Sequence, residues 1–131
     1  MSSFLHAQKV NLEFLKLAWK TSWTFRLTLI FSWLIWLLVL VAPFLRLTPG
    51  SEEIKFIPLH YNVFFGVDKF GPWYTVFQLP IFGFFVLLIN FSVAVRFFKR
   101  ERALSLFACV AAFLIQIMLA AAMYFTVLLN M

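Results

Sequence analysis

The stretch that decides the fold is residues 27–45, LTLIFSWLIWLLVLVAPFL, a run of 19 residues without a charged side chain. As a helix rising about 1.5 Å per residue, this run is roughly 28 Å long, close to the thickness of the hydrocarbon core of a bilayer. Arg26 and Arg46 bracket the run and can extend their charged ends to the two membrane surfaces. We therefore predict a first membrane-spanning helix over residues 27–45, with Pro43 in its last turn, where a proline costs little.

The composition of the whole chain agrees with a membrane protein. Of its 131 residues, 64% are hydrophobic and 12% are charged, whereas soluble domains carry about 25% charged residues. A small globule cannot bury such an apolar excess, so the expected solvent is the lipid bilayer. The net charge of +6 comes from basic residues beside apolar runs, which favours an anionic membrane surface over nucleic acid as the partner. Cys109 is the single cysteine, which excludes an intramolecular disulfide and a cysteine-based zinc site.

Two further spans are expected, over residues 74–96 and 103–129, joined by a charged cytoplasmic turn over 97–102. Pro80 lies near the start of the second span and predicts either a bend or a short separate helix before it. The third span would be about 40 Å long as a straight helix, longer than the hydrocarbon core, so we expect it to tilt or project.

The third span carries a seam of small residues. Ala108, Ala112, Gln116 and Ala120 are spaced by four and share one helix face, and we call them the alanine seam. Small residues at this spacing allow another helix to approach closely, and a buried amide requires a hydrogen-bond partner. We therefore expect the alanine seam to face protein.

The polar residues Gln78 and Asn90 lie in the second span. They are interpreted either as helix-packing contacts or as the lining of a polar pathway. Counted from the turn between the spans, Asn90 and Gln116 differ in depth by roughly 10 Å, so the two amides should not meet. Gln116 instead lies level with Gly83, where the missing side chain would let the amide reach a backbone group near Pro80.

The N-terminal segment, residues 1–26, alternates charged and apolar side chains at helical spacing. One interpretation is an amphipathic helix on the membrane surface, and the other, for residues 4–26, is a cytoplasmic extension of the first span. A secretory signal peptide is not expected, because the apolar run that follows is longer than a signal core.

The distribution of Lys and Arg predicts the orientation. Four Lys and Arg residues lie in the N-terminal segment, and four lie in or beside the turn over 97–102. The loop over 46–73 has three, balanced by three acidic residues. Basic segments stay on the cytoplasmic side, so we expect a cytoplasmic N-terminus, an extracytoplasmic C-terminus and an extracytoplasmic loop over 46–73.

The loop contains the stretch IKFIPLHYNVFFGVDKFGPW, residues 54–73, which predicts either two short strands in a hairpin or an irregular loop on the outer surface. His60, Asn62 and Asp68 could form a metal or polar-ligand site, or could hydrogen-bond the loop's own backbone. One histidine and one acid are too few for a zinc site, so no metal is expected. The chain also shows no spaced nucleophile and base and no glycine-rich phosphate loop, which argues against an enzyme or a cofactor.

Two resemblances rest on this loop. The residues Pro58-Leu59-His60-Tyr61-Asn62, then Gly66, Asp68 and Gly71-Pro72-Trp73, resemble a family of small bacterial membrane proteins with three spans. More distantly, the pattern is similar to the DUF1648 domain of toxin-immunity and signalling membrane proteins, with Asn62–Gly66 one residue longer and Gly66–Asp68 one residue shorter than usual there. The first resemblance implies a bacterial inner-membrane protein, and neither implies a specific activity.

The sequence therefore predicts an all-α integral membrane protein with three transmembrane helices, an N-terminal amphipathic helix and one structured extracytoplasmic loop. The first hypothesis for its function is a non-catalytic protein that works by helix–helix and loop contacts, as a homo-oligomer or an accessory subunit of a membrane complex. The alternatives are a toxin-immunity or sensing protein that binds an extracytoplasmic ligand, and an oligomeric channel or transporter with Gln116 facing a pore.

Overall fold

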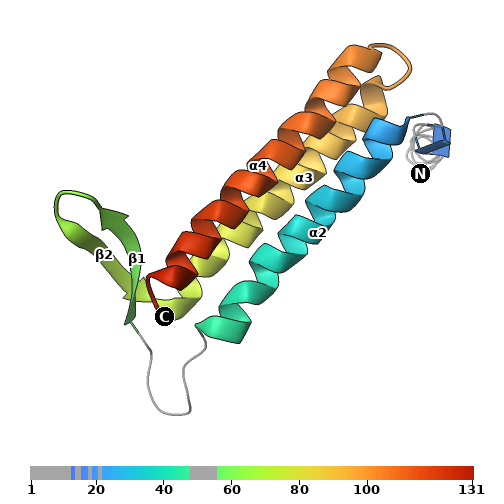
Figure 1. Ribbon diagram of the computed structural model, residues 1–131. Coiled ribbons are helices and arrows are strands. Elements are labelled where there is room, and N and C mark those ends of the chain that lie inside the picture. Colours follow the sequence, from blue (N-terminus) through green and yellow to red (C-terminus); the bar gives the residue numbers. More distant parts are fainter. Residues whose placement is uncertain (1–12, 14–15, 18, 21, 48–55) are drawn as a thin grey trace, which may run out of the picture. The chain divides into compact units, whose positions relative to one another are not determined.

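The computed structural model describes residues 13, 16, 17, 19, 20, 22–47 and 56–131. The protein is mostly helical (76%) with a small two-stranded sheet. The elements are α2 (Trp23–Arg46), β1 (Phe56–Asn62), β2 (Gly66–Pro72), the 3-10 helix η1 (Trp73–Phe77), α3 (Gln78–Phe97) and α4 (Arg102–Leu128), as Figure 1 shows.

Three helices of the described chain are long and apolar enough to cross a membrane: Trp23–Arg46, Trp73–Phe97 and Arg102–Leu128. This confirms the expectation of three long apolar helices. The all-α class needs one correction, because part of the loop forms a two-stranded sheet. Of the two alternatives left open for that loop, the hairpin is the one observed, since backbone pairing satisfies the donors and acceptors of an apolar segment.

The N-terminal helix expected over residues 1–26 falls largely outside the described residues. Its last residues belong to α2, which begins at Trp23. Ser22 caps this helix, because its Oγ accepts a hydrogen bond from the backbone N–H of Phe25 at 3.3 Å. A serine oxygen at this position satisfies one of the free N–H groups of the first turn.

Pro80 marks the change from one helix type to another. It is the third residue of α3, directly after η1. In the first turn of an α-helix the N–H that proline lacks has no partner within the helix, so Pro80 breaks no hydrogen bond there. Of the two predicted effects of Pro80, the short helix before it is observed as η1, which runs directly into α3 and belongs to the same apolar span.

The contacts divide the chain into two compact units, and α2, α3 and α4 each contribute a segment to both. The first unit comprises residues 1–34 and 85–115. In it, Phe25 is fully buried and meets Phe91 and Phe98 edge to face, with ring centroids 6.4 and 6.0 Å apart. The Ser105 hydroxyl donates to the Ala94 carbonyl at 2.7 Å, which joins α4 to α3 beside their short connection.

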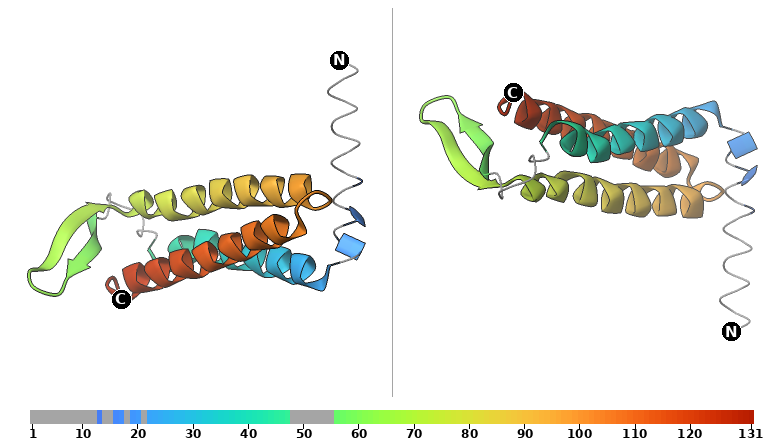
Figure 2. Two further views of the ribbon diagram at one scale, coloured as in Figure 1. Left: turned by 90° about the horizontal axis from the view of Figure 1, so that it is seen from above. Right: turned by 90° about the horizontal axis from the view of Figure 1, so that it is seen from below.

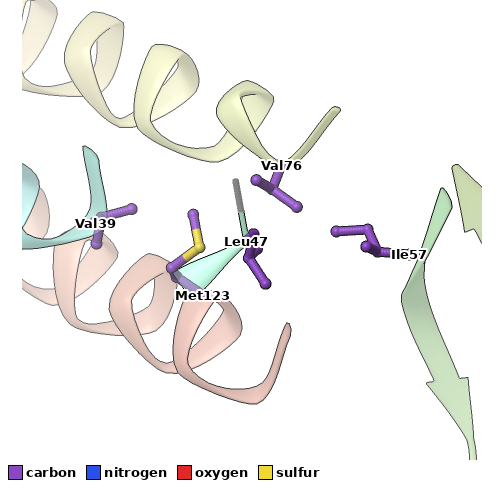
Figure 3. Close-up of a cluster of buried hydrophobic side chains, with 5 residues drawn as sticks. All are labelled: Val39, Leu47, Ile57, Val76 and Met123. Carbon is purple, nitrogen blue, oxygen red and sulfur yellow. The ribbon is translucent and has the colours of Figure 1, made fainter. Parts of the chain in front are cut away.

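The second unit comprises residues 35–84 and 116–131 and contains the hairpin. Its core cluster contains one buried side chain from each of five parts of the chain (Figure 3). They are Val39 of α2, Leu47 directly after α2, Ile57 of β1, Val76 of η1 and Met123 of α4. All five are at most 4% exposed. The base of the hairpin is thus part of the same core as the helix ends.

The two strands pair antiparallel, and the hairpin projects away from the ends of the helices (Figures 1 and 2). Asn62 pairs with Gly66, so residues 63–65 form the tip. Gly66 has a φ of 74°, in the left-handed region. Glycine enters this region without a steric cost, which explains its position at the turn.

We predict that Ile57→Ala destabilises the second unit by about 2–4 kcal/mol, the usual cost of removing a buried isoleucine side chain beyond its Cβ. The measurement is the free energy of unfolding in detergent micelles. Val63→Ala, at a position 84% exposed in the same hairpin, is the matched control and should change the free energy by less than about 0.5 kcal/mol. Equal effects from the two substitutions would mean that the base of the hairpin is not part of the core.

Candidate functional site: the hairpin and the polar groups of the helices

The tip of the hairpin is a cluster of exposed apolar side chains. Val63, Phe64 and Phe65 are 84%, 89% and 84% exposed. The Asn62 Oδ1 accepts a hydrogen bond from the Phe64 backbone N–H at 2.9 Å, which is an Asx turn. Together with Gly66, this hydrogen bond gives the tip a defined conformation. Large exposed apolar groups held in a fixed shape are typical of contact surfaces.

His60 and Asp68 are brought together across the two strands. Their Nδ1 and Oδ1 atoms are 2.7 Å apart, and the side chains are 63% and 39% exposed. In the strand pairing His60 lies opposite Lys69, next to Asp68, and the ladder has irregularities on both sides of His60. Such an exposed pair contributes little to stability. Because both side chains are partly exposed, a polar ligand can reach the pair.

The three predicted loop residues do not converge on one point. The Asn62 oxygen accepts a hydrogen bond from the loop backbone, which was one of the two interpretations of this residue. His60 and Asp68 bond to each other rather than to the loop backbone. Across the described part of the chain, no group of three or more His, Cys, Asp or Glu side chains lies close enough to hold a metal ion. Two ligands fall short of a protein zinc site.

The base of the hairpin is tied to the end of α4. The Asn130 Nδ2 donates to the Pro58 carbonyl at 3.0 Å and to the Thr126 carbonyl at 2.7 Å. Leu59 lies over Gly71, where an added Cβ would come within 2.6 Å of the leucine Cδ1. Sequence reasoning missed Asn130, because the pairing spans 72 residues and no local pattern signals it.

Gln116 forms its hydrogen bond at the level of Gly83, as its depth in the helix predicted. Its Nε2 donates to the Gly83 carbonyl at 2.8 Å, and the side chain is fully buried. An added Cβ on Gly83 would lie 3.0 Å from both the Gln116 Oε1 and the Leu119 Cδ1. The absence of a side chain at Gly83 is therefore what allows α3 and α4 to approach here, and the predicted pairing of Gln116 with Gly83 is confirmed.

Several other polar side chains of the helices bond backbone groups, whereas the buried Ser32 Oγ has no hydrogen-bond partner among the described residues. The Asn90 Nδ2 donates to the Val86 carbonyl of its own helix at 2.9 Å. Gln78 is the exposed first residue of α3. The Trp36 Nε1 donates to the Pro80 carbonyl at 2.8 Å, a contact between α2 and α3 that the sequence analysis did not anticipate.

The alanine seam is covered by its own chain. In the first unit Ala108 and Ala112 are 6% and 0% exposed, and in the second Gln116 is fully buried. Ala120 is half-buried and packs against the core cluster. The seam therefore serves packing within one chain, and a second chain would need another surface. The protein that the seam was expected to face is, for these described residues, the chain itself.

The chain matches no family model, no curated protein and no solved structure. The resemblance of the loop to three-span bacterial membrane proteins and to the DUF1648 domain stays a prediction.

We predict that Gly83→Leu lowers the free energy of unfolding by about 2 kcal/mol, because the new side chain overfills the space beside Gln116 and Leu119. Ala121→Leu makes the same kind of change on the exposed face of α4 and is the matched control. Both variants are compared by denaturation in the same detergent. A Gly83→Leu protein as stable as the control would contradict the close packing of α3 on α4 at this level.

Proposed function

We propose that this chain is a small, non-catalytic integral membrane protein that works by protein–protein contact, as a homo-oligomer or as an accessory subunit of a membrane complex. The observation that carries the proposal is the hairpin. Its base is fixed in a helix core by Ile57 and by the Asn130–Pro58 hydrogen bond, and its tip presents Val63, Phe64 and Phe65 to the surroundings. A rigid arm with an apolar tip is suited to binding another protein.

The cellular setting is part of the same proposal. Lys and Arg gather in the N-terminal segment and around the turn between α3 and α4, which supports a cytoplasmic N-terminus and an extracytoplasmic hairpin and C-terminus. Many large apolar side chains on the helices are exposed, such as Leu45 at 74% and Phe107 at 73%. These faces support a location in a membrane, and the resemblance of the loop supports the bacterial inner membrane.

A second candidate is a toxin-immunity or sensing protein, and the observation that favours it is the exposed His60–Asp68 pair at 2.7 Å. This pair offers both a hydrogen-bond donor and an acceptor to an extracytoplasmic ligand. The channel alternative stays a prediction, and the described contacts of Gln116, which is buried and donates to the Gly83 carbonyl, do not favour it.

The orientation is tested by labelling single cysteines in a Cys109→Ser background. We expect a membrane-impermeant maleimide to label Val63→Cys in intact cells, because the hairpin tip lies outside. Arg100→Cys, in the turn between α3 and α4, should react only after the membrane is opened. The opposite pattern would overturn the proposed orientation, and labelling of both sites in intact cells would overturn three spans.

The contact role is tested by changing the tip. Phe64→Ser removes an 89% exposed ring, and we expect it to weaken the assembly at least about ten-fold, as loss of an aromatic hot spot does. Phe56→Ser, a 65% exposed ring near the base, is the matched control and should keep the assembly. Native mass spectrometry in nanodiscs reports the stoichiometry. A wild-type monomer without a bound chain, or an assembly indifferent to Phe64→Ser, would contradict the contact role.

A further inference from the structure

An apolar groove of about 480 Å³ lies between the last part of α2 and the last part of α4, within the second unit. Val39 and Met123, both 2% exposed members of the core cluster, line it together with the small residues Ala42 and Ala120. Alanines on both helices leave space that larger side chains would fill. The volume falls within the range of roughly 300–1,000 Å³ that is usual for ligand sites.

The rim of the groove is exposed and largely apolar. Leu38 and Leu45 on α2 are 68% and 74% exposed, and Tyr124 on α4 is 63% exposed. The buried lining residues offer no side-chain hydrogen-bonding group, so a polar ligand could not be satisfied inside. A flexible hydrocarbon chain is the ligand that this part of the groove can accept.

Arg46 gives the groove a charged end. Among the described residues that line it, Arg46 alone has a charged side chain, and it is the last residue of α2. No described carboxylate forms an ion pair with it. A guanidinium group binds phosphate oxygens in a bidentate manner, and its long stem can reach the headgroup layer from a helix end.

The length of the groove agrees with one lipid leaflet. From Leu38 to Arg46 the helix advances eight residues, which is about 12 Å. Half of a hydrocarbon core of about 30 Å is about 15 Å. An acyl chain lying in the groove would therefore bring its headgroup to the level of Arg46.

We propose that this groove binds one anionic phospholipid, with an acyl chain between α2 and α4 and the phosphate on Arg46. The proposal rests on the proposed membrane location of the chain. The positive charge of the guanidinium favours a lipid with net negative charge over a zwitterionic one, whose own cation would lie close to the guanidinium.

The test uses the full chain purified in mild detergent, stripped of lipid and given equal amounts of palmitoyl-oleoyl phosphatidylglycerol and phosphatidylcholine. Native mass spectrometry counts the bound lipids. We expect one phosphatidylglycerol per chain, bound in preference to phosphatidylcholine. In Arg46→Gln this preference should fall about five-fold, because the variant loses one partly solvated charged hydrogen bond. Arg96→Gln, in the last turn of α3, is the matched control and should keep the preference.

The apolar part of the site is tested separately. Ala42→Phe and Ala120→Leu fill the groove from α2 and from α4, and each should lower the occupancy of both lipids. Circular dichroism checks that the variants are folded. For any variant that is not, phosphatidylglycerol with a photoreactive acyl chain is bound to the wild-type protein, and crosslinks should map to the groove, at Met123 or its neighbours.

Several results would overturn the lipid site. These are equal lipid preference in Arg46→Gln and Arg96→Gln, unchanged occupancy in both folded groove variants, or crosslinks on other surfaces. Competition by inorganic phosphate alone would also overturn it, because the acyl chain would then contribute nothing. A second copy of the chain seated in the groove, seen as a lipid-free dimer that Ala42→Phe dissociates, would replace the lipid as the occupant.

The two proposals fail in distinguishable ways. If cysteine labelling shows no spanning helices, the proposed membrane protein and the lipid site fail together. If labelling supports the spans while Arg46→Gln leaves the lipid preference intact, the lipid site alone fails. The tip variant Phe64→Ser lies outside the groove and should not change lipid binding.

Discussion

A polar group surrounded by hydrocarbon has no water to bind, and the packing of these helices depends on that constraint. The Gln116 amide is fully buried in the middle of α4, where its Nε2 donates to the Gly83 carbonyl and its Oε1 has no hydrogen-bond partner among the described residues. That bond requires α3 and α4 to approach closely, and Gly83 permits the approach because it has no side chain. Ser105 makes a comparable bond to Ala94, so in each unit a side chain of α4 is tied to the backbone of α3.

The base and the tip of the hairpin differ in how they contact the rest of the chain. At its base, Ile57 enters the helix core and Asn130 holds the Pro58 carbonyl, so burial and hydrogen bonding keep the strands in place. At its tip, the side chains of Val63, Phe64 and Phe65 are not buried by other described residues and remain exposed. A two-stranded hairpin alone is marginal in water, so the fixed base is what makes a defined tip possible.

Burial divides the apolar surface into inner and outer parts. The alanine seam, which the sequence analysis expected to face protein, is buried against the chain's own helices. The surfaces that stay open include the hairpin tip and the groove lined by Ala42 and Ala120. Our proposals about partners rest on these two surfaces.

The sequence by itself determined the three long apolar helices, because uninterrupted apolar runs of this length have few other solutions. It also determined the level at which Gln116 meets α3, since helix rise converts residue number into depth. It left open whether residues 56–72 form strands, because Pro58 and the aromatics suit both a hairpin and an irregular loop. Only the tertiary structure decided the pairing of Asn130 with Pro58, the burial of Ile57 and the groove beside Arg46. Each of these features depends on contacts between segments that are far apart in the chain, and such contacts cannot be predicted from local periodicity.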